Sequence, residues 1–164
     1  MLRVIEPSHE GGHLTNATCY QNLDTLYQAV GETDQAKDFY ERALEILLKK
    51  LGAEHVNVVA SYHSQGSLRS DLGETGQAKE YYNCALEIRL KKLGAEHVGV
   101  AASYDNLGSL HSALGEIDQE KEYHHRALEI YLKKLGAENV HVATSYNNLS
   151  SLHIALGETA QEKE

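Results

Sequence analysis

Apolar and polar residues follow one another along most of this chain with the spacing of an amphipathic helix. In one representative segment the apolar and aromatic stripe, which steps by 4, 3, 4 and 3 positions, consists of Val100, Tyr104, Leu107, His111 and Leu114. Such steps bring the side chains onto one face of a helix. The pattern recurs and predicts seven helices, over residues 14–30, 34–50, 56–72, 76–92, 98–114, 118–134 and 140–156.

Glycines mark the expected helix ends, because glycine readily adopts the positive φ with which many helices finish. One glycine follows the first helix of each expected pair, at Gly31, Gly73, Gly115 and Gly157. A second glycine, Gly94, follows the lysines that close the next helix. Small polar residues are expected to cap the second helices; the candidates are Thr33, Thr75, Asp118 and Thr159. The pattern therefore predicts pairs of helices joined by short turns.

The helix pairs belong to a sequence repeat with a period of 42 residues. The string LGAEHV begins at Leu51 and again at Leu93, and LGAENV begins at Leu135. A fixed period of roughly 20–50 residues is typical of solenoids, in which each unit buries its apolar face against its neighbours. We expect a tail at 1–8, units at 9–50, 51–92 and 93–134, and an incomplete fourth unit at 135–164. Because that unit lacks its second half, we expect the chain to be part of a longer array.

Composition narrows the class of partner and the compartment. The net charge of −9 argues against nucleic acid and anionic membranes, which need clustered lysine and arginine. The two cysteines, Cys19 and Cys84, form no CxxC motif or disulfide framework, as expected in a reducing compartment. The first residues lack the apolar run of a signal peptide, and no stretch approaches the roughly 18 apolar residues of a membrane span. A cytoplasmic location is therefore expected.

Two groups of residues in the second unit carry a resemblance to a known family. They are Tyr62, Gln65, Gly66 and Arg69 in the first helix, and Ala78, Tyr82 and Ala85 in the second. With these spacings the chain resembles the tetratricopeptide repeat, and its period of 42 with LGxxH and ALEI strings is similar to the kinesin light chain and nephrocystin variety. The resemblance implies an all-α fold, an α-α superhelix or solenoid of tandem helix-turn-helix repeats. HEAT and armadillo repeats, with periods of roughly 40–47 residues, are the alternative.

Several positions depart from the pattern of that family. Valine follows His55, His97 and Asn139 where the variety usually has proline, which should loosen the start of these helices. In the third unit Glu120 replaces the alanine, and His124 the tyrosine, of the second unit. Because a glutamate at a packing position weakens the contact between helices, we expect His124 to be partly exposed and the third unit to be the least stable.

The side chains that could carry chemistry do not converge in the sequence. Ten histidines are present, and His9 and His13 stand four residues apart, but a structural zinc site needs four ligands and usually includes cysteine. No Gly-rich phosphate loop and no supported Ser–His–Asp or Cys–His arrangement occurs, and most histidines are expected to be solvated or in turns. We therefore expect no enzymatic activity, no cofactor and no metal. A metal- or pH-responsive helical protein is the hypothesis that rests on the histidines alone.

A row of polar residues occupies a face of the first helices that packing does not use, and by the resemblance this face lines the concave groove of the array. These groove positions are Gln21, Asn22, Thr25, His63, Ser64, Ser67, Asp105, Asn106, Ser109, Asn147, Asn148 and Ser151. Amides carry both donors and acceptors, so such a row can hold the backbone of an extended peptide. An ordinary solvated helix face is the alternative. The lack of lysine and arginine, with Asp71 and Asp105 present, favours a neutral to mildly basic ligand.

The leading functional hypothesis is a non-enzymatic module that binds a protein or peptide, within a larger adaptor or cargo-binding protein. The alternative is a structural, self-associating solenoid that uses its ends instead of the groove. For this alternative the last expected helix offers a stripe made of Val142, Tyr146, Leu149, His153 and Leu156. Because the helix that would cover this stripe is cut off at Glu164, we expect a homodimer through that end.

Overall fold

The computed structural model describes residues 33–161 of the 164-residue chain, and this part consists of six helices without any strand. In order they are α2 (Thr33–Leu51), α3 (Val56–Asp71), α4 (Thr75–Leu93), α5 (Val98–Ala113), α6 (Ile117–Leu135) and α7 (Val140–Gln161). Apart from the end of α7, every bound lies within one residue of the expected one. The first expected helix, over residues 14–30, lies outside the described residues.

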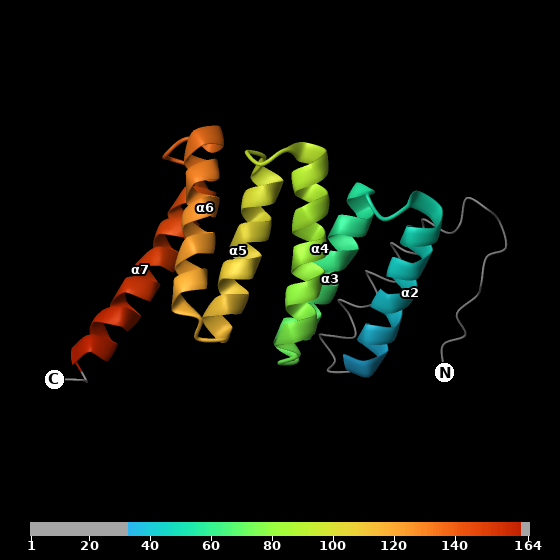
Figure 1. Cartoon of the computed structure of the whole chain (residues 1–164), viewed down its shortest axis with the longest axis horizontal. Helices are drawn as coiled ribbons and strands as arrows, with labels where there is room; N and C mark the ends of the chain where they lie inside the picture. Colours follow the sequence, from blue (N-terminus) through green and yellow to red (C-terminus); the bar gives the residue numbers. More distant parts are fainter. Residues whose placement is uncertain (1–32, 162–164) are drawn as a thin grey trace.

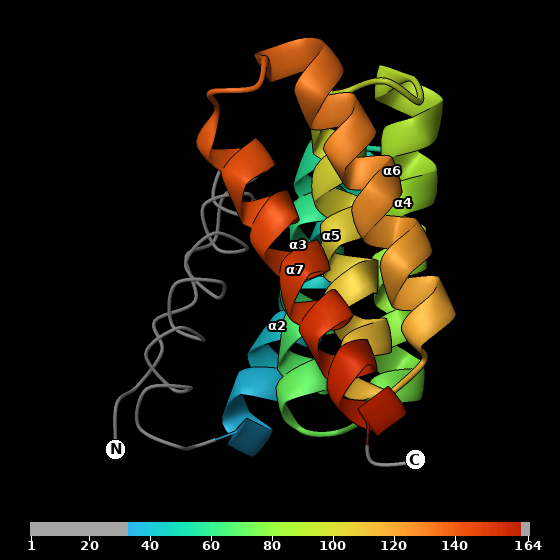
Figure 2. The same cartoon turned by 90° about the vertical axis from the view of Figure 1, so that its left-hand side faces the viewer.

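The helices follow one another in chain order along one axis and alternate in direction (Figure 1), with α5 and α7 on one side of this row and α4 and α6 on the other (Figure 2). The most extensive packing lies within the pairs α3–α4 and α5–α6, and the contacts α4–α5 and α6–α7 join consecutive pairs. Figure 2 looks along the row from the α7 end. Because each helix packs mainly against its neighbours in the sequence, the expectation of an all-α solenoid of helix pairs is confirmed.

Glycine turns connect the helices as expected, with one exception. Gly73 and Gly115 follow the first helix of a pair with φ of 74° and 69°, and Gly94 follows the second helix with φ of 83°. Other residues are strained at such φ, which explains why glycine recurs there. The expected stop at Gly157 is wrong, because α7 continues through it and Thr159 is a helical residue instead of an N-cap. Within the described residues α7 packs against the preceding helix α6 and is followed by no further helix, so no contact favours a reversal of the chain there.

Two of the second helices, α4 and α6, begin without the side-chain caps that the sequence indicated. Thr75 is the first residue of α4, and the N-cap position belongs to Glu74, whose side chain makes no capping hydrogen bond. The Glu74 carboxylate instead pairs with Lys37 of α2 and Arg69 of α3. Asp118 likewise lies inside α6 instead of capping it. These expectations were wrong because contacts between helices, which local sequence does not show, engage the residues at the N-cap positions.

The residues that precede the first helices supply caps that the sequence analysis did not find. The Nδ1 atom of His97 accepts a hydrogen bond from the backbone N–H of Gly99 at 2.9 Å, and His55 makes the equivalent bond before α3. Asn139 accepts in the same way from the backbone of His141. Each bond satisfies one free backbone donor of the first turn. The caps give the recurrence of histidine or asparagine at these places a physical reason.

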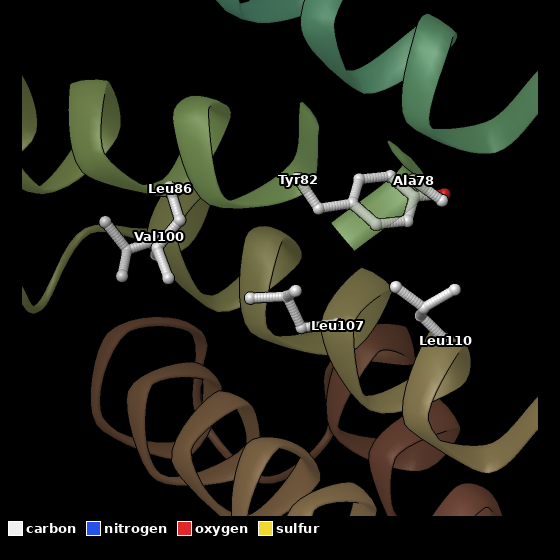
Figure 3. Packing of buried hydrophobic residues seen from close by; sticks show 6 residues of the cluster. All are labelled: Ala78, Tyr82, Leu86, Val100, Leu107 and Leu110. Atoms are coloured by element: carbon white, nitrogen blue, oxygen red, sulfur yellow. The ribbon is translucent and has the colours of Figure 1, made fainter. Parts of the chain in front are cut away.

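The core lies between the helices, and one of its clusters joins α4 to α5. It consists of Ala78, Tyr82 and Leu86 of α4 and Val100, Leu107 and Leu110 of α5 (Figure 3). The Tyr82 ring also lies against Gly66 of α3, where a Cβ atom would come within 2.6 Å of the ring. The glycine therefore provides the space that the buried aromatic ring occupies.

His124 occupies the place of Tyr82 in the next pair, and the expectation that it is partly exposed is wrong. The residue is 2% exposed. Its ring lies against Gly108, where a Cβ atom would come within 2.8 Å of the ring, and its Nδ1 lies 3.1 Å from Oδ1 of Asp105. A buried polar ring needs such a hydrogen bond. The space left by the glycine and the carboxylate on α5 together allow a histidine to replace the tyrosine.

The apolar stripe expected on α7 is only partly exposed. Val142 and Leu149 are buried in a cluster with residues of α5 and α6, so only the rest of the stripe is available for contacts with other molecules. Tyr146 is 50% exposed, and the other exposed large apolar residues in the described part of this helix are Val140 and Ile154, at 70% and 62%. The reason is that α7 must use part of its apolar surface to pack against the preceding pair.

Candidate functional site

The groove positions inferred from the sequence lie on the first helix of each pair, α3, α5 and α7. Nine of the twelve fall within the described residues, whereas Gln21, Asn22 and Thr25 lie outside them. Three of the nine are exposed, namely Ser109, Asn147 and Ser151. The other six are half-buried, namely His63, Ser64, Ser67, Asp105, Asn106 and Asn148. None of the nine is a core residue, so solvent reaches each of them.

His63 and Asn106 link two neighbouring first helices, α3 and α5. Burial lowers the pKa of His63, and a hydrogen bond between its side chain and that of Asn106 acts in the opposite direction. The structure therefore brings groove positions from different units within hydrogen-bonding reach of each other.

Arg89 of α4 brings a positive charge close to these residues, which corrects the expectation that no lysine or arginine is present. Its charge also lowers the pKa of His63. Its Nη1 donates a hydrogen bond to Oγ of Ser103 in α5 at 2.6 Å, and burial lowers the pKa of Arg89 itself. A sequence signal existed, because Arg89 stands where the neighbouring units have Leu47 and Tyr131.

Asp105 is engaged with α6, the second helix of its own pair. It lies 3.1 Å from His124 and also forms a hydrogen bond with Tyr131. Burial raises the pKa of Tyr131, and the negative charge and the hydrogen bond of Asp105 raise it further. With its side chain 23% exposed, Asp105 contacts residues of α6 and exposes only part of its carboxylate to solvent.

A hollow of about 430 Å³ opens between α5, α6 and α7. Its lining consists of Ser109, Ser112, Ala113, Glu120, His124, Asn148 and Ser151. Three of these residues are groove positions, which the structure brings together from two units. Glu120 and His124 come from α6, and the sequence analysis treated them only as disturbed packing positions. Their joint departure from the repeat was the signal that could have marked them.

Metal binding, a reactive cysteine and a membrane-spanning helix have weaker support in the described part of the chain. In the part of the chain that the structure describes, no three histidine, cysteine or acidic residues are grouped so that they could hold a metal ion. His9 and His13 lie outside that part. Cys84 has a free thiol whose pKa is raised by burial and by nearby carboxylates, which makes it a poor nucleophile at neutral pH. Among the six described helices, none combines the length and the apolar character that crossing a membrane requires.

Comparison with known proteins identifies the family. A family model for the tetratricopeptide repeat matches residues 25–91 and 58–133. The crystal structure of BtubC (BKLC) from P. vanneervenii superposes with a TM-score of 0.77 at 28% identity; the match covers 86% of this chain and 56% of that one, so this chain spans just over half of its length. A kinesin light chain-like protein of Podosopora anserina with nearly identical TPR-like repeats gives a TM-score of 0.74 at 24% identity, over 98% of this chain and 74% of that one. Among curated protein sequences, none matches this chain significantly.

The matched region includes all of α2, α3, α4 and α5 and extends over more than half of the chain. Its fold is shared with repeats of the kinesin light chain type. The period of 42 residues, the glycine turns and the packing of Tyr82 on Gly66 are the features of this structure that accompany the match. The chain therefore belongs to the tetratricopeptide repeat family.

Proposed function

We propose that this chain is a non-enzymatic scaffold module that binds extended segments of partner proteins along its groove positions. Tetratricopeptide repeats generally mediate contacts between proteins, and their fold is typically a scaffold instead of an enzyme. One observation carries the proposal: nine polar groove positions, on three first helices, stay outside the core and within reach of solvent. The proposed setting is a larger adaptor or cargo-binding protein in the cytoplasm.

The groove positions offer what the backbone of an extended peptide needs. Peptide N–H and C=O groups are costly to enclose without partners, and amide side chains can serve both. Asn106 and Asn148 occupy the same place in consecutive units, 42 residues apart. The net charge of −9 adds a preference for neutral to mildly basic ligands.

Replacing Asn106 and Asn148 together by alanine should weaken the binding of a groove peptide by about 1–3 kcal/mol, because peptide groups that lose their partners remain unpaired. Suitable probes are peptides selected against the full chain from a random library displayed on phage. Isothermal titration calorimetry then measures their affinity for the wild-type chain and the double variant.

The matched control replaces Gln77 and Gln119 by alanine, since these two amides are exposed on α4 and α6 and are not groove positions. Unfolding in urea tests whether the Asn106/Asn148 variant keeps the stability of the wild type, because Asn106 also forms a hydrogen bond with His63. If the selected peptides lose affinity for the control variant but not for the Asn106/Asn148 variant, they bind elsewhere and the groove proposal is wrong.

Self-association through α7 is the second candidate function, and the exposed apolar residues of this helix favour it. Val140, Tyr146 and Ile154 are at least half exposed. At about 100° per residue they fall within one third of the helix circumference. A grouped apolar surface of this kind tends to find a partner. A second copy of the chain is the partner that we propose for this face.

The paired changes Tyr146→Glu and Ile154→Glu should convert such a dimer into a monomer, because they would bury two carboxylates in the contact. Sedimentation velocity over a range of protein concentrations measures the change. The control pair Gln77→Glu and Gln119→Glu adds the same charge to exposed positions on other helices. A wild-type chain that sediments as a monomer at the highest concentration would refute the candidate.

A further inference from the structure

Two residues of α6 depart from the repeat at the same place. Glu120 and His124, one helical turn apart, stand where both preceding units have alanine and tyrosine. In α4 the corresponding Ala78 and Tyr82 are buried in the core between helices. In α6 the two replacements both line the hollow between α5, α6 and α7. The departure from the repeat therefore coincides with a concavity on the groove.

Glu120 is mostly buried as a residue, but its carboxylate keeps access to the hollow and pairs with no other described residue. The residue is 8% exposed, and its side chain makes no hydrogen bond or ion pair with any residue in the described range. Glu54 and Glu96, by contrast, pair with lysines. Even partial removal of an unpaired carboxylate from water costs some free energy, which the alanine of the other units avoids. Stability therefore does not account for Glu120, and a residue that breaks a local rule in this way is typical of a binding site.

The surroundings of Glu120 do not neutralise its charge. No lysine or arginine lines the hollow. His124 directs its Nδ1 to Asp105, 3.1 Å away, and is engaged there. The rest of the lining consists of three serine hydroxyls, one amide and one alanine methyl group. The hollow thus presents one negative charge surrounded by neutral groups that can form hydrogen bonds.

We propose that this hollow is a subsite for one cationic side chain, lysine or arginine, of the partner segment. The inference rests on the proposed function, because Ser109, Asn148 and Ser151 place the hollow on the groove. An ammonium or guanidinium group there donates charge-assisted hydrogen bonds to Glu120, and such bonds are stronger than neutral ones. The volume of about 430 Å³ is within the roughly 300–1,000 Å³ of small-molecule sites.

The donor set favours an organic cation over a metal ion. A metal site needs several converging ligands, and in residues 33–161 no three histidine, cysteine or acidic residues are so grouped. One carboxylate with neighbouring hydroxyls instead suits a single group that donates several hydrogen bonds. The subsite thus selects partner segments that carry a basic residue at one fixed position.

The test uses the full chain and a random-peptide library displayed on phage. Parallel selections are made on the wild-type chain and on Glu120→Ala, which restores the residue of the two preceding units and should therefore fold. Peptides selected on the wild type are expected to share a lysine or arginine at one position. Their affinity for Glu120→Ala and for Glu120→Gln should fall roughly ten- to a hundredfold, the loss that follows from removing a hydrogen bond to a charged group. The control Glu129→Ala removes an exposed carboxylate from the same helix and should leave the affinity unchanged.

A double-mutant cycle makes the assignment specific. Changing the basic residue of the peptide to glutamine should weaken binding to the wild type but cause little further loss in Glu120→Ala. If peptides depend on Asn106 and Asn148 but lack a common basic residue, or bind Glu120→Ala as tightly as the wild type, the subsite is wrong and the groove proposal stands. If no selected peptide depends on Asn106 and Asn148, the proposed function fails and the subsite fails with it.

Discussion

Replacing Tyr82 by alanine is expected to lower the free energy of unfolding by about 3–5 kcal/mol, the usual cost of truncating a buried aromatic residue. Tyr82 is 7% exposed and belongs to the core cluster that also contains Leu86 of its own helix and Val100, Leu107 and Leu110 of α5. Alanine would leave a cavity at the junction of two helix pairs, where both pairs lose contact. Urea denaturation followed by circular dichroism at 222 nm measures the loss.

Two further variants separate the contributions of the ring and the hydroxyl group. Burial raises the pKa of Tyr82, and the Tyr82 hydroxyl group forms a hydrogen bond with the side chain of Ser67. Tyr82→Phe keeps the ring and loses only this bond, so the expected cost is about 0.5–1.5 kcal/mol. His124→Ala should cost an amount of the same order as Tyr82→Ala, because His124 is buried in the equivalent place. A loss below 1 kcal/mol for Tyr82→Ala would show that the packing of α4 on α5 described here is wrong.

Two glycine-to-alanine changes in helices are expected to act in opposite directions. At Gly66 the added Cβ atom would lie 2.6 Å from the buried ring of Tyr82. Because the ring is only 7% exposed and belongs to the core cluster with α5, overpacking should cost about 1–3 kcal/mol. That cost should exceed the roughly 1 kcal/mol by which alanine favours a helix over glycine. Gly66→Ala is therefore expected to destabilise the chain although it improves helix propensity.

Gly76→Ala is the matched control, because no atom lies within 4 Å of a Cβ added there. Gly76 is an exposed residue of the first turn of α4. Alanine should stabilise the fold by about 0.4–1 kcal/mol, mainly by restricting the unfolded chain. Urea midpoints at constant slope compare the two variants. Stabilisation by both substitutions would contradict the close contact between α3 and the Tyr82 ring.

Helix positions were determined by the sequence because they depend on local periodicity. The apolar spacing and the glycine turns placed nearly every bound of the six described helices within one residue. The same spacing marked Tyr82 as a core residue, and it is buried. These features need only the angular position of each residue on its own helix and the preference of glycine for positive φ.

The errors concern residues whose environment depends on another helix. At the start of α4 the Glu74 side chain forms ion pairs with Lys37 and Arg69, which lie on other helices, and it makes no capping hydrogen bond. His124 is buried because Gly108 leaves room for its ring and Asp105 satisfies it. Such effects depend on the distance between helix axes and on the size of facing side chains. The spacing of apolar residues along the sequence gives neither quantity.

The candidate site divides in the same way. The sequence by itself determined which positions of the first helices are polar and unused by the packing stripe, and that set includes Asn106 and Asn148. Only the tertiary structure decided which side chains of the second helices reach them. It brought Arg89 close to His63, and it placed Glu120 in the hollow with Ser109, Asn148 and Ser151. The physical reason is that the polarity of a groove position depends on its own residue alone. The charged side chains that lie near that position come from the neighbouring helix, and only the packing of the two helices brings them there.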